Sequence, residues 1–115
     1  MIKLMTFVLI IGLVFLSCSD ECEGENPSMQ LVNNGTGKAD IQIKTSGGNT
    51  ENINNVEPGT SSVRKEFAPG EIEFTINIQG VNEPIVYTLN VVHCYDYTVT
   101  INPDNTVIGS QTEKD

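Results

Sequence analysis

The chain has 115 residues with 6 Lys and Arg against 15 Asp and Glu, which gives a formal net charge of −9. Nucleic acid is not an expected partner, because phosphate neutralisation by Lys and Arg supplies almost all non-specific affinity for it. The same acidity disfavours electrostatic adsorption to anionic lipid. A chain of this length has room for one domain with one small core.

The first predicted element is an export signal. Lys3 supplies a positive start, residues 4–16 form an apolar run, and Ser17 is a small residue at its end. The run is shorter than the roughly 20 apolar residues that a membrane-spanning helix needs. We therefore expect residues 1–17 to form a helical signal peptide that is removed from the mature protein.

The residues around Cys18 carry a family resemblance. Phe15-Leu16-Ser17-Cys18 resembles a bacterial lipobox, which implies that Cys18 is lipidated and becomes the first mature residue. Ser19, Asp20 and Glu21 follow directly and resemble the acidic export signal of Bacteroidota surface lipoproteins. The resemblance implies a protein anchored by lipid in the outer membrane and exposed at the cell surface. A periplasmic orientation, with these acids as a simple linker, is the alternative.

The cysteine count predicts a disulfide. If Cys18 carries lipid, Cys22 and Cys94 are the two remaining thiols in the chain. A small exported domain has a large surface relative to its core, so a covalent cross-link is expected. We predict a Cys22–Cys94 disulfide, which contributes on the order of 4 kcal/mol on the chain-entropy model.

The mature chain divides into a tether, a domain and a tail. We expect residues 18–28 to form an acidic tether, 29–109 a β domain and 110–115 a flexible tail. Apolar residues alternate with polar ones between Gly, Pro and Asn turn signals, most clearly where Ile72, Phe74, Ile76 and Ile78 share a face. The expected strands, in chain order, are 29–32, 39–45, 51–56, 62–67, 71–78, 85–92, 95–101 and 106–108.

The pattern predicts an all-β fold. Outside the signal segment, no window of ten or more residues has helical periodicity. Seven or eight short antiparallel strands of this kind are typical of a small immunoglobulin-like β-sandwich. In the strand at 62–67, Val63 and Phe67 lie on either side of the basic pair Arg64 and Lys65. Cys94 falls on the opposite parity from Leu89 and Val91, which predicts a tight turn or bulge near residues 93–96.

One cluster could carry chemistry. His93 is the single histidine and lies beside Cys94, with Tyr95 and Tyr97 following. A zinc site needs three or four convergent ligands, and a cysteine nucleophile needs a free thiolate. Because we expect Cys94 to be oxidised, we predict no catalytic residue, no metal site and no cofactor. His93, Tyr95 and Tyr97 remain a candidate ligand patch.

These features predict a non-enzymatic, lipid-anchored surface module with a binding or structural role in the cell envelope. Its expected partners are the membrane, through the lipid anchor, and an envelope protein or a glycan. We expect the domain to be a monomer. The alternative is a small secreted enzyme or enzyme inhibitor that uses loops near His93.

Overall fold

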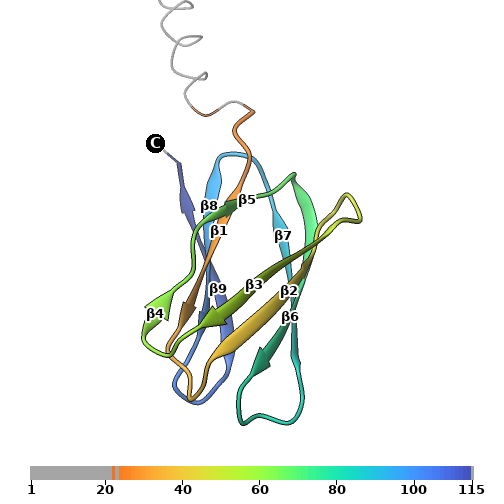
Figure 1. The fold of residues 1–115 in the computed structure, drawn as a ribbon. Coiled ribbons are helices and arrows are strands. Elements are labelled where there is room, and N and C mark those ends of the chain that lie inside the picture. The colour runs from red at the N-terminus through yellow and green to blue at the C-terminus, as the bar shows by residue number, and fades with distance from the viewer. Residues whose placement is uncertain (1–21, 23, 115) are drawn as a thin grey trace, which may run out of the picture.

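Nine β-strands and no helix make up the residues that the computed structural model describes, which are 22 and 24–114 (Figure 1). The strands are β1 (Ser28–Asn33), β2 (Ala39–Lys44), β3 (Thr50–Val56), β4 (Thr60–Ser61), β5 (Lys65–Glu66), β6 (Gly70–Ile78), β7 (Ile85–Val91), β8 (Tyr95–Ile101) and β9 (Val107–Glu113).

The strands form two facing sheets. One sheet has the order β4-β1-β8-β9, with β5 on the same edge of β1 as β4, and the other has the order β3-β2-β6-β7. Every pairing is antiparallel except that of β1 with β8, which is parallel. The predicted all-β sandwich is confirmed. The parallel pair is a departure from it, and it is possible because a long crossover separates β1 from β8.

The core lies between the sheets and follows the alternation of the sequence. From β6 it receives the four side chains that were expected to face inward, all buried. Burying each such side chain stabilises the fold by roughly 1.5–3 kcal/mol. The other buried apolar side chains are those of Met29, Leu31, Ala39, Ile41, Ile43, Ile53, Val56, Phe67, Val91, Tyr97, Val99 and Ile101.

The segment 62–67 is not the single strand that was expected. Phe67 is buried, Val63 is 70% exposed, and Ser62 is buried. The Ser62 hydroxyl accepts the Leu31 N–H at 3.0 Å and donates to the Val63 carbonyl at 2.8 Å. The chain therefore pairs with β1 in two short pieces, β4 and β5, and the strand count rises to nine.

The C-terminal residues were also predicted wrongly. The segment expected to be a flexible tail continues β9 as far as Glu113, with Gln111 opposite Tyr97 and Glu113 opposite Tyr95. Polar side chains do not prevent this, because β-ladder hydrogen bonds are made by the backbone. At the other boundary, β1 begins at Ser28.

The sandwich has two distinct ends, and both described chain ends lie at one of them (Figure 1). We call this the tether end: it contains Cys22, residues 24–27, the turn at 92–94 and Lys114. The opposite end, which we call the far end, contains the loops at 34–38, 57–59, 79–84 and 102–106.

A buried asparagine organises the far end. Asn33 is fully buried, and its Nδ2 donates to the carbonyls of Gly37 at 2.9 Å and Val56 at 2.8 Å. Its Oδ1 accepts the Gly35 N–H at 2.9 Å. One side chain thus satisfies two backbone groups of the loop at 34–38 and one at the end of β3, and a buried polar group is stable when its partners are provided in this way.

Candidate functional site

Cys22 and Cys94 meet at the tether end. Their Cα atoms are 5.3 Å apart across a sequence separation of 72, with the two sulfurs joined as a disulfide. Cys94 is in the tight turn after β7 and has a φ of 74°, a conformation uncommon for residues other than glycine. The predicted pair and the predicted turn are both present. The disulfide fastens the segment that precedes β1, which we call the leader, to the start of β8.

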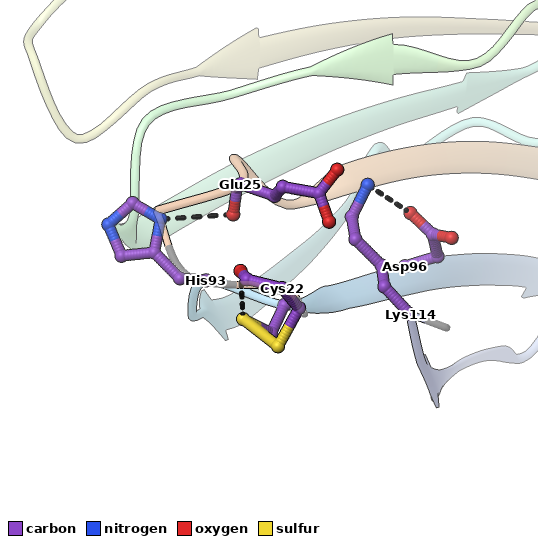
Figure 2. Close-up of a disulfide and its surroundings, with 6 residues drawn as sticks. Cys22, Glu25, His93, Asp96 and Lys114 are labelled. Carbon is purple, nitrogen blue, oxygen red and sulfur yellow. Dashed lines mark hydrogen bonds and ion pairs between the residues drawn. A yellow bond between two sulfur atoms is a disulfide. The ribbon is translucent and has the colours of Figure 1, made fainter. Parts of the chain in front are cut away.

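The Glu25 carbonyl makes a second connection between leader and turn. It accepts the backbone N–H of Cys94 at 3.2 Å and lies 3.0 Å from Nδ1 of His93 (Figure 2). Because a carbonyl can only accept, Nδ1 carries the proton in this contact. The contact from Cys94 Sγ to the Cys22 carbonyl, also drawn in Figure 2, is not a hydrogen bond, since an oxidised sulfur has no proton to donate.

The C-terminal residues also contact the turn at 92–94. The Lys114 N–H donates to the Cys94 carbonyl at 2.8 Å. The Lys114 ammonium reaches Asp96 on β8, with Nζ 3.1 Å from Oδ1 (Figure 2). The leader, the turn at 92–94 and the end of β9 are therefore joined to one another at the tether end.

The Asp96 carboxylate also belongs to a polar network on the outer face of the sheet that contains β1 and β8. Ser28 is buried, and its hydroxyl donates to Asp96. The Arg64 guanidinium donates to Ser28 Oγ at 2.9 Å and, through its other terminal nitrogen, to Gln30 Oε1 at 3.3 Å. The Ser28 hydroxyl, followed by the Lys114 ammonium, holds the pKa of Asp96 below its ordinary value, with a further contribution from Arg64.

This network places two of the few basic residues of the chain near one carboxylate. Lys114 contacts Asp96 directly, and Arg64 is connected to it through the Ser28 hydroxyl. Chemically it fixes β1, β8, the segment between β4 and β5, and Lys114 to one another, and it places a hydroxyl beside a carboxylate that stays ionised. Sequence reasoning did not find it. Ser28, Asp96 and Lys114 are neighbours only because β1 pairs in parallel with β8 and because β9 continues beyond Gly109.

The predicted ligand patch at His93, Tyr95 and Tyr97 is wrong in one of its members. Tyr97 is 1% exposed, and its hydroxyl accepts the Val92 N–H at 3.1 Å. The physical reason is the alternation of β8, which places Tyr97 on the same inward face as Val99 and Ile101. Tyr97 is a core residue and cannot present a face to a ligand.

The other two members lie at the rim of the core. Tyr95 is half-buried with its ring 6.4 Å from that of Tyr97, and His93 is exposed beside Glu25. Tyr95 is therefore only partly accessible there, whereas His93 is accessible. An enzyme or enzyme inhibitor that uses loops near His93 stays an untested prediction.

The surface of the described residues has shallow hollows. One of them, of about 440 Å³, lies between β3 and β4 and is lined by residues 52–56, 60–63 and Lys65. Among residues 22 and 24–114, no group of three or more His, Cys, Asp or Glu side chains is arranged to bind a metal. Within the same residues there is no helix long and apolar enough to cross a membrane.

Several predicted sites lie outside the described residues. These are the signal peptide at residues 1–17, the lipidation site Cys18 and the sorting residues Ser19, Asp20 and Glu21. The first described residue, Cys22, is four positions after Cys18. The disulfide therefore begins close to the predicted point of attachment.

Comparison with known proteins gives a likeness in fold. No family model matches the chain, and no curated protein matches it. Among solved structures, the C-terminal domain of AlgF from P. aeruginosa is similar, with a TM-score of 0.51 and 11% sequence identity over 78% of this chain and 99% of that domain. At this identity the likeness shows a shared β-sandwich fold and nothing about activity.

Proposed function

We propose that this protein is a lipid-anchored module of the outer membrane whose β-sandwich domain has a binding or structural role at the cell surface. The observation that carries the proposal is the covalent link from Cys22 to Cys94. Because Cys22 follows the proposed lipidation site by four residues, an anchor at Cys18 would be joined to the folded domain by a very short tether.

The positions of the chain ends support the proposal. The leader and the end of β9 both lie at the tether end, and both bond to the turn at 92–94. An anchor at this end would direct the far end, with its four loops, away from the membrane (Figure 1). Loops positioned by a rigid scaffold are where binding residues most often occur.

The charge of the mature chain supports the same orientation. Removal of residues 1–17 takes away Lys3, so that five Lys and Arg remain against 15 Asp and Glu. An acidic domain is repelled by anionic lipid head groups. This repulsion would keep the domain away from the lipid surface, while the acyl chains would keep the protein attached to the membrane. An envelope protein or a glycan is the partner class we propose.

The test is a comparison of two cysteine variants in cells. Cys18→Ala should release the protein from the membrane fraction into the soluble fraction, because it removes the attachment point. Cys22→Ala is the matched control, since it removes a cysteine four residues away and should leave the protein in the membrane fraction. Membrane association of Cys18→Ala equal to that of the unaltered protein would overturn the anchor.

A second variant tests the surface location. Replacement of Ser19, Asp20 and Glu21 by alanine should protect the domain from protease added to whole cells, while membrane association is unchanged. Unaltered digestion of this triple variant would show that the acidic residues do not direct export, and absence of digestion of the unaltered protein would favour the periplasmic orientation.

A further inference from the structure

One asparagine of the far end is placed where spontaneous deamidation is fastest by chemistry. Asn34 is the single asparagine of the chain that is followed directly by glycine, and it is exposed in the loop at 34–38. In such a pair the backbone nitrogen of the glycine attacks the side-chain amide carbon, because no Cβ obstructs its approach. In an unfolded chain Asn34 is therefore the asparagine expected to react first.

The reaction needs only water. The bond from the Gly35 nitrogen to Cγ of Asn34 forms, the bond from Cγ to Nδ2 breaks, and ammonia leaves with the proton that the Gly35 nitrogen gives up. Water then opens the resulting succinimide ring at one of its two carbonyls, which yields aspartate or isoaspartate. The protein has lost one ammonia and gained one water, without any oxidant or reductant.

In the folded domain the attacking nitrogen is occupied. The Gly35 N–H donates to Oδ1 of Asn33 at 2.9 Å, and Asn33 is fully buried. The Asn33 amide is itself held in place, because its Nδ2 donates to the carbonyls of Gly37 and Val56. Loss of the Gly35 proton, which the attack requires, would leave a buried acceptor without its partner, and this costs free energy.

Packing also holds Gly35 in position. A Cβ at Gly35 would lie 2.8 Å from the Ile101 side chain and 2.5 Å from Oδ1 of Asn105. The Asn34 N–H donates to the Ile101 carbonyl at 2.8 Å. The Thr36 N–H donates to Asn105 Oδ1 at 3.0 Å. The attack needs the Gly35 nitrogen to turn toward the Asn34 side chain, and these contacts oppose that rotation while the loop is closed.

The same arrangement recurs at other asparagines of the described domain. The N–H that follows Asn54 donates to Oδ1 of Asp40 at 2.7 Å. The N–H that follows Asn105 donates to Oδ1 of Asp104 at 3.1 Å. Blocked nitrogens are thus a shared feature of these turns, but the block has the largest effect at Asn34, because there the unblocked reaction is fastest.

We propose that Asn34 is a deamidation site that Asn33 keeps closed. Conversion to aspartate or isoaspartate then takes place only when the loop at 34–38 opens, so its rate is set by local opening of the far end. Isoaspartate lengthens the main chain by one carbon directly before Gly35, where neighbouring side chains leave no room. A loop that has formed this product cannot close again in its original conformation.

The modification would change the surface that we propose to face partners, and this consequence alone rests on the proposed function. A neutral amide becomes a carboxylate on a chain whose formal net charge is already −9. Both the charge and the shape of the loop at 34–38 would differ between new and aged molecules. Binding through the far end would then weaken with the age of the protein.

The test follows Asn34 by mass spectrometry of peptides from the purified protein during incubation in mildly alkaline buffer. In the folded protein Asn34 should react at least about tenfold more slowly than in the same protein unfolded by guanidinium chloride, because the folded protein must first open locally. Equal rates in the two states would overturn the proposal, and so would an unfolded chain in which Asn34 is not the first asparagine to react.

Two variants test the role of Asn33. Asn33→Ala removes the acceptor of the Gly35 N–H and should raise the rate at Asn34 in the folded protein at least about tenfold. Ile72→Ala is the matched control, because it destabilises the fold through the core and leaves the contacts of the loop in place. The rate at Asn34 should change far less in this control. An unchanged rate in Asn33→Ala that circular dichroism shows to be folded would refute the shielding.

Hydrogen exchange tests the same opening in the unaltered protein, so the result does not depend on whether a variant folds. The Gly35 N–H should exchange slowly, and the N–H of Gly47, in an exposed turn, should exchange rapidly. With added denaturant the deamidation rate should rise in parallel with the exchange rate of Gly35. Exchange of Gly35 as fast as that of Gly47 would overturn the proposal.

These measurements separate the proposal from the proposed function, because none of them involves the anchor. If Cys18 is not lipidated in cells but Asn34 is shielded, the anchor is wrong and the deamidation site stands. If Cys18 is lipidated but Asn34 reacts equally fast in the folded and the unfolded protein, the shielding is wrong and the anchor stands.

Discussion

The two ends of the sandwich are held together by different kinds of interaction. At the tether end a disulfide joins Cys22 to Cys94, and an ion pair joins Lys114 to Asp96. At the far end neutral hydrogen bonds from the buried Asn33 join the loops. The first set of interactions depends on the redox state and the pH of the surroundings, and the second depends on neither.

This difference fits the position that each end would have in the exported, anchored protein that we propose. The tether end would receive any force transmitted through the leader, and there the connection is covalent. The far end would face partners, and there the loop conformations are maintained by amide groups that do not titrate. Changes made at the two ends should therefore respond differently to reductant and acid.

The largest expected effect is removal of the disulfide. Replacing Cys22 and Cys94 together by serine should lower the free energy of unfolding by about 4 kcal/mol, because the unfolded chain is no longer constrained by a long loop. Denaturant unfolding measures this loss, and reductant should reproduce it in the unaltered protein. A loss below about 1 kcal/mol would mean that the tether end does not depend on the covalent link.

The next largest effect is expected at Asn33. Asn33→Ala removes three hydrogen bonds and leaves buried backbone groups without partners, which should cost about 3 kcal/mol of unfolding free energy. Reductant should not change this difference. The exposed neighbour variant Asn34→Ala should stay within about 0.5 kcal/mol of the unaltered protein.

Combining the two changes sharpens the comparison between the ends. If the ends are independent, the losses caused by Asn33→Ala and by the double serine variant should add to within about 0.5 kcal/mol. A larger deviation would show that the ends are coupled through the strands that connect them. Denaturant unfolding of the triple variant gives the result directly.

A smaller effect is expected where the loop at 34–38 approaches the end of β6. A Cβ at Gly37 would collide with the backbone carbonyl of Gln79, which cannot move as a side-chain tip can. Gly37→Ala should therefore destabilise the fold by about 2 kcal/mol. Gly47→Ala is the matched control, because a Cβ there meets no atom within 4 Å. Equal stability of the two variants would refute the close approach.

The smallest effect is expected at Asp96. Its pKa is lowered, so its contribution is present above the ordinary aspartate value of about 3.9 and is lost as the pH falls through the lowered value. Asp96→Asn should reduce the thermal midpoint slightly at neutral pH, and the two proteins should converge once the pH falls below the lowered pKa of Asp96. A difference that persists in strong acid would assign the effect to packing and not to charge.

The sequence alone was sufficient to predict the all-β sandwich. Strict alternation in Gly70–Ile78 and Ala39–Lys44 identified two central strands and their buried faces, because a period of two has a single interpretation. The segment 62–67 failed since Val63 looks like a core residue by composition. The side chain that is buried there is Ser62, whose hydroxyl can take part in backbone pairing with β1.

The tether end was predictable in part. Cysteine counting identified the Cys22–Cys94 pair, and the phase change identified the turn. The contacts of Asp96 with Ser28 and Lys114 could not be found, because they require knowledge of which strands are neighbours.

The most direct test of an anchored domain with a covalently fastened leader is mass spectrometry of the mature protein, intact and after digestion without reduction. The account predicts a chain that begins at Cys18, carries acyl groups on that residue, and contains a peptide with Cys22 linked to one with Cys94. A chain that retains residues 1–17, an unmodified Cys18, or a disulfide formed through Cys18 would contradict it.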